Sequence, residues 1–77
     1  NKMTTSLTNA EKATIVNSRL KNLNYNKFSL EIDKVVENAK ADPDEEVLAK
    51  YTEFLADNAI QIAALTTELA KYPVEEA

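Results

Sequence analysis

The chain of 77 residues contains no glycine, no cysteine, no histidine and no tryptophan. Without cysteine it has no disulfide framework of the kind that holds small secreted domains together. Without histidine and cysteine it also lacks the usual ligands of zinc, haem and iron–sulfur clusters, and the commonest general base. Without glycine it has no phosphate-cradling loop. We therefore expect no catalytic residue, no metal site and no cofactor, and we do not expect an enzyme.

The residues that are present favour one small helical domain, since 44% of them are hydrophobic and 29% are charged. Residues 1–40 carry seven basic and four acidic side chains, a net charge of +3, whereas residues 41–77 carry two and nine, a net charge of −7. A basic half joined to an acidic half indicates two segments that lie against each other. The overall charge of −4 disfavours nucleic acid as a partner.

Neither a targeting segment nor a membrane segment is visible. Residues 1–6 contain one Lys and no apolar run, unlike a signal peptide. The longest apolar stretch, residues 59–65, is interrupted by Gln61 and is far shorter than the roughly 20 residues that span a membrane. We expect a cytoplasmic protein with no membrane contact, and we interpret residues 1–7 as a disordered or tag-like N-terminus.

The first helix is predicted over residues 8–41. Thr8 and Glu11 have the spacing of a capping box. Apolar residues then follow in steps of three and four, in two stripes: Ala13, Val16, Leu20 and Leu23, and then Tyr25, Phe28, Ile32, Val35 and Ala39. The stripes are about 120° out of phase around the helix axis. Either the helix breaks near residues 24–26 or it continues with two apolar faces, and the lack of Gly and Pro favours continuity.

A turn is predicted over residues 41–43, followed by a second helix over residues 43–72. Pro43 suits the first helical position, with Asp42 as the N-cap and Glu45 at the third position. Pro73 closes the helix, and residues 73–77 are expected to fray. The heptad seam of this helix is regular: Leu48, Tyr51, Leu55, Asn58, Ile62, Leu65, Leu69 and Tyr72.

Two long helices with a short connection predict an all-α, coiled-coil-like antiparallel hairpin. Val35 and Ala39 are expected to face Leu48 and Tyr51, and the apolar residues further from the turn are expected to pair in the same order: Ile32 and Phe28 with Leu55 and Asn58, Tyr25 with Ile62, and Leu20 and Val16 with Leu65 and Leu69. The aromatic residues are therefore interpreted as core, apart from Phe54, which flanks the seam. One such seam buries little surface, so a lone hairpin is marginally stable.

Self-association would complete this core. The second helix has a further stripe of mostly small residues, and we expect an interface made of Phe54, Ala56, Asn58, Ile60, Ala63, Thr67 and Ala70. Two hairpins would form a four-helix bundle, and a dimer is the expected state. Asn58 at a core position would fix register or subunit number, or else it lies at a solvated gap. The acidic residues 42–46 are explained by helix capping, since a calcium loop needs a glycine.

Three segments of the chain resemble short α-helical proteins of unassigned function from marine bacteriophages: residues 7–12 (LTNAEK), 19–28 (RLKNLNYNKF) and 58–69 (NAIQIAALTTEL). The resemblance implies a small helical phage protein, in the host cytoplasm, and brings no catalytic residues. Two functions follow as hypotheses. The first is a non-catalytic assembly module that acts by homo-oligomeric packing. The alternative is a small regulatory binder of a host protein, with the acidic helix as the contact or as a mimic of DNA.

Overall fold

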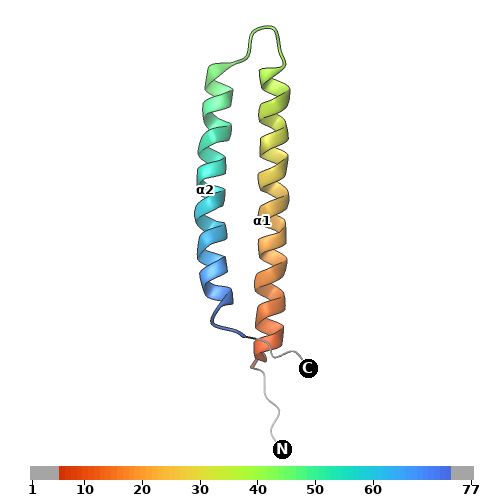
Figure 1. The fold of residues 1–77 in the computed structure, drawn as a ribbon, viewed down its shortest axis with the longest axis vertical. Coiled ribbons are helices and arrows are strands. Elements are labelled where there is room, and N and C mark those ends of the chain that lie inside the picture. The colour runs from red at the N-terminus through yellow and green to blue at the C-terminus, as the bar shows by residue number, and fades with distance from the viewer. Residues whose placement is uncertain (1–5, 74–77) are drawn as a thin grey trace, which may run out of the picture.

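A computed structural model describes residues 6–73, which form two antiparallel α-helices joined by one short connection (Figure 1). Helix α1 spans Asn9–Asn38 and helix α2 spans Glu45–Leu69. The described part of the chain contains no strand. The predicted all-α hairpin is therefore confirmed. Residues 1–5 and 74–77, which include most of the predicted N-terminal tail and the predicted frayed C-terminus, lie outside the described residues.

Helix α1 begins at the capping box that the sequence predicts. The Thr8 side chain accepts a hydrogen bond from the Glu11 N–H at 3.0 Å, and the Glu11 carboxylate accepts one from the Thr8 N–H at 2.8 Å. The helix runs without a break through residues 24–26, as the lack of Gly and Pro favoured. It ends at Asn38, three residues before the predicted end, and Ala39 caps it.

The turn differs from its prediction. Asp44, and not Asp42, is the N-cap of α2, because its carboxylate accepts hydrogen bonds from the Glu46 and Val47 N–H groups. Pro43 therefore precedes the helix and does not occupy its first position. The connection spans residues 39–44, longer than the predicted 41–43. An acceptor from α1 explains the choice of cap: the Glu37 carboxylate accepts the Asp44 N–H at 2.8 Å and so fixes that residue over the end of α1.

The seam predicted for the second helix is confirmed, since all eight of its residues, Leu48 to Tyr72, are half-buried or buried. The helix itself is shorter than predicted, because α2 ends at Leu69 and not at residue 72. The α1 side of the seam is different. From Ala13, Val16, Leu20 and Leu23 it continues in phase, and the next positions that approach α2 are Leu30, Lys34 and Glu37. The prediction that Tyr25, Phe28, Ile32, Val35 and Ala39 form the core against α2 is wrong, because all five are exposed.

Continuity of α1 explains why the seam stays in phase. A shift of the seam to the second stripe would need a kink or an unwound turn, and α1 has neither Pro nor Gly to supply one. The helix instead brings polar residues to α2 near the turn. The Lys34 ammonium donates to the Thr52 hydroxyl at 3.3 Å, and the Lys34 side chain is half-buried.

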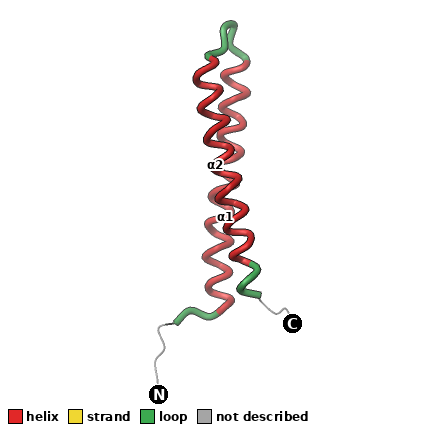
Figure 2. Tube along the Cα trace, turned by 90° about the vertical axis from the view of Figure 1, so that its left-hand side faces the viewer, coloured by secondary structure: helices red, strands yellow, loops and turns green. Residues whose placement is uncertain are grey.

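Specific contacts fix the register along the whole hairpin. In Figure 2 the two helices change sides between the upper and lower halves, which shows that they cross at a shallow angle. At the open end the Lys12 ammonium lies 5.4 Å from the centre of the Tyr72 ring. Near the middle the Asn58 amide donates to the Leu23 carbonyl at 2.9 Å. Asn58 is 6% exposed, so it lies at a buried position of the seam and not at a solvated gap, and its role in fixing register or subunit number stays a prediction.

Candidate interaction surfaces

The first candidate surface is the α1 outer stripe, which we define as Tyr25, Phe28, Ile32 and Val35. Tyr25 is 75% exposed, Phe28 63% and Val35 62%, and Ile32 is also exposed. At 3.5 residues per turn, this stripe is centred about 150° around the axis from the seam with α2. Large apolar side chains therefore cover the face of α1 that points away from its own partner helix, where α2 cannot shield them from water.

The second candidate surface is the α2 outer stripe, which we define as Ala56, Ile60, Ala63, Thr67 and Ala70. All five residues are exposed, and Ile60 is 67% exposed. The same arithmetic places this stripe about 150° from the α2 seam. Its small side chains leave room for the backbone of a neighbour to approach closely. The two outer stripes thus lie on opposite edges of the hairpin, and one chain cannot bring them together.

A shallow groove runs along one flank between the helices. Phe54, which is half exposed, and Asn58 line its turn-side part together with Leu23 and Leu30. The buried Asn58 Oδ1 has no hydrogen-bond partner there. The seven predicted interface residues therefore divide in two: Phe54 and Asn58 line this groove, whereas the other five form the α2 outer stripe.

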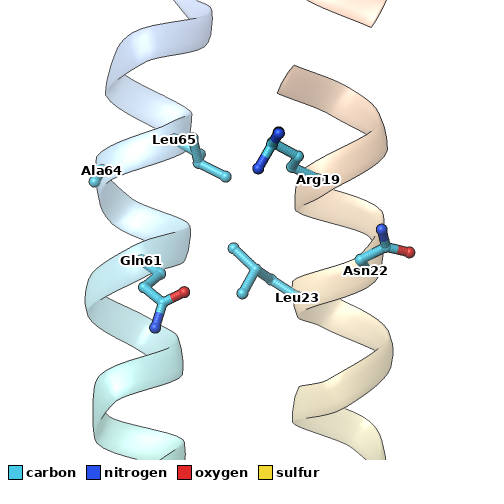
Figure 3. A pocket seen from close by; sticks show the side chains of 6 residues that line it. All are labelled: Arg19, Asn22, Leu23, Gln61, Ala64 and Leu65. Atoms are coloured by element: carbon cyan, nitrogen blue, oxygen red, sulfur yellow. The ribbon is translucent and has the colours of Figure 1, made fainter. Parts of the chain in front are cut away.

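The groove continues toward the open end of the hairpin (Figure 3). In this view Leu23 and Leu65 point toward each other from the two helices, and Arg19 reaches across from α1. Gln61 and Leu23 belong to both parts of the groove. Amide and aliphatic side chains dominate this lining, and Asp57 is the one carboxylate among the residues that line the two parts of the groove. The groove therefore offers packing and hydrogen bonds more readily than acid–base chemistry.

The perturbed ionisable groups belong to the two ends of the hairpin. The Asp44 N–H and the Lys40 ammonium, 2.9 Å away, lower the pKa of Glu37. At the other end the Tyr72 hydroxyl donates to Glu68 at 2.6 Å, and this bond lowers the pKa of Glu68 and raises that of Tyr72. Each shift has a local structural cause within the helix or turn that carries it. The hydrogen bonds and ion pair that cause them join groups at the two ends of the hairpin.

Residues 6–73 contain no group of three or more acidic side chains that could hold a metal ion. Within the same range, neither helix is long and apolar enough to cross a membrane. Comparison with family models, with curated proteins and with solved structures gave no match.

The α1 outer stripe is the surface that sequence reasoning misplaced. The signal was present, because the stripe that contains Phe28 is out of phase with the stripe that contains Val16, by about 120° at 3.6 residues per turn and by about 150° at 3.5 residues per turn. Extending the steps of three and four from Leu23 leads through the exposed Lys27 to Leu30, Lys34 and Glu37, which lie on the observed seam. The hydrogen bond from the Asp44 N–H to the Glu37 carboxylate, which we call the latch, follows from the same extension, since this extension places the Glu37 carboxylate beside the turn.

Proposed function

We propose that this protein is a non-catalytic helical assembly module that acts by homo-oligomeric packing. One observation carries the proposal: each helix exposes an apolar stripe on the side opposite to its intramolecular seam. A monomer of this size has few other ways to bury Tyr25, Phe28 and Ile60, and contiguous exposed apolar surface marks interaction sites.

The small core of the hairpin supports the same function. Within residues 6–73, Ala13 and Val16 are the only buried hydrophobic residues, and no side chain is completely enclosed. A hairpin with so little buried apolar surface gains stability when another helix covers its outer faces. The four-helix assembly of two hairpins, predicted from the sequence, is the smallest assembly in which an outer face of each hairpin is covered.

The substitution Ile60→Asp tests the proposal. It places a charge at the most exposed large residue of the α2 outer stripe and touches no seam residue. We expect the mass in solution, measured by light scattering behind a sizing column, to fall toward the 8.6 kDa of one chain while helical circular dichroism is retained. An unchanged oligomeric mass would show that the α2 outer stripe is no interface.

A further inference from the structure

The proposed self-association does not specify which surface of a second copy contacts the α2 outer stripe. The α1 outer stripe is a suitable surface. We propose that the α1 outer stripe of one copy docks on the α2 outer stripe of a second copy. This inference rests on the proposed function and names the contact through which it works. Three properties of the described residues carry it: the direction of the two stripes, their charge and their size.

The direction of the stripes requires a second chain. Each stripe is centred about 150° from the seam of its own helix, so within one hairpin they face away from each other. In a closed bundle of four helices each helix packs against two neighbours, and its two contact faces lie about 90° apart around its own axis. The two outer stripes lie on opposite edges of the hairpin, so each copy can bind one neighbouring copy through its α1 outer stripe and another through its α2 outer stripe. Contacts between two different surfaces of identical chains produce rings or filaments.

The net charges of the two helices favour pairing of α1 of one copy with α2 of another. Residues 9–38 carry five basic and four acidic side chains, a net charge of +1, whereas residues 45–69 carry one and five, a net charge of −4. Pairing α2 with α2 would oppose two strongly negative helices, and pairing α1 with α1 would oppose two weakly positive ones. Pairing α1 with α2 is the combination that brings opposite net charges together, which favours both the encounter and the register.

The sizes of the side chains in the two outer stripes also favour pairing of α1 with α2. The α1 outer stripe consists of large side chains, two of them aromatic, whereas the α2 outer stripe contains an alanine every seven residues. These alanines are Ala56, Ala63 and Ala70. Large side chains on one helix pack well between small side chains on another, as knobs into holes. Ile60 lies between Ala56 and Ala63 and supplies an aliphatic contact for the aromatic rings of Tyr25 and Phe28.

The area is sufficient for a specific contact. With aromatic side chains of about 150–250 Å² and smaller aliphatic ones, the exposed fractions of Tyr25, Phe28, Ile32 and Val35 leave roughly 500 Å² of surface. If the second copy loses an equal area, the contact buries about 1,000 Å² in total, which is the lower limit for a specific interface. We therefore expect association that depends on concentration and not a permanent complex.

A mixing experiment tests the contact. Phe28→Asp places a charge in the α1 outer stripe and leaves the α2 outer stripe intact. Ile60→Asp places a charge in the α2 outer stripe and leaves the α1 outer stripe intact. Each variant alone is expected to sediment as a single 8.6 kDa chain at concentrations where the unsubstituted chain associates. An equimolar mixture contains one intact stripe of each kind on different chains, so it is expected to form complexes of two chains and no larger ones.

Controls make each outcome decisive. Asn17→Asp adds the same charge to α1 at an exposed position outside the stripe, and it should associate as the unsubstituted chain does. Circular dichroism verifies that each variant is folded, and Ile32→Asp replaces Phe28→Asp should that variant lose helicity.

The possible failures are distinguishable. If the unsubstituted chain associates but the mixture of variants stays monomeric, the docking of α1 on α2 is wrong and the assembly function stands. If Ile60→Asp associates fully while Phe28→Asp does not, α1 pairs with itself and the inference is again overturned. If the unsubstituted chain is a monomer at every concentration, both the inference and the proposed function fail.

Discussion

Replacement of Asn58 by Leu is expected to stabilise the hairpin. Asn58 is 94% buried in the seam, where its amide donates to the Leu23 carbonyl and its Oδ1 has no partner. The hydrogen bond contributes about 1 kcal/mol net. A buried Leu at the same position gains about 2 kcal/mol from the transfer of its side chain out of water. The difference predicts that the free energy of unfolding rises by about 1 kcal/mol.

The assay is urea denaturation followed by helical circular dichroism, at one fixed protein concentration because association shifts apparent stability. Asn58→Ala is the matched control: it removes the same hydrogen bond without adding apolar surface, and it should lower the free energy of unfolding by about 1 kcal/mol. A Leu variant less stable than the unsubstituted chain would refute the reasoning, because it would show that the Asn58 bond contributes more than burial of a Leu side chain does.

Two further predictions concern the turn. Asp44→Ala removes the observed N-cap of α2 and should lower the free energy of unfolding by about 1 kcal/mol, whereas Asp42→Ala, at the mistaken cap position, should change it by less than about 0.5 kcal/mol in the same denaturation assay. Because the folded state lowers the pKa of Glu37 below 4.5, its contribution is fully present above that pH and is lost as the pH falls through the folded value. The stability difference between the unsubstituted chain and Glu37→Gln, measured by urea denaturation from pH 7 to pH 2, should therefore be constant above pH 4.5 and shrink below it; a difference that persists at pH 2 would contradict the proposed latch.

The features that local chemistry determines were predicted well from the sequence. The capping box at Thr8 and Glu11 is a pair of contacts within one helical turn, and it is present as expected. The α2 seam follows one unbroken heptad pattern, so periodicity alone identified its eight residues. Continuity of α1 through residues 24–26 followed from the absence of residues that break helices.

The features that depend on competition between two faces were predicted less well. On α1, apolar composition favoured Tyr25, Phe28 and Ile32 as the core, whereas helix continuity favoured the positions in phase with Val16. Continuity prevailed, because one rigid helix cannot turn its face halfway along without a break.

The cap of α2 was misplaced for a related reason. Asp42 and Asp44 are both good caps by type, and a contact from another element, the Glu37 carboxylate seven residues earlier, decides between them. Sequence spacing near the turn contains no sign of that contact until the α1 seam is known.

The measurement that tests self-association most directly is sedimentation equilibrium of the unsubstituted chain over a wide range of concentrations. The outer stripes predict a weight-average mass that rises above the 8.6 kDa of one chain as the concentration increases. A mass that stays at 8.6 kDa at every concentration would contradict it, because Tyr25, Phe28 and Ile60 would then remain exposed to water without any copy of the chain to cover them.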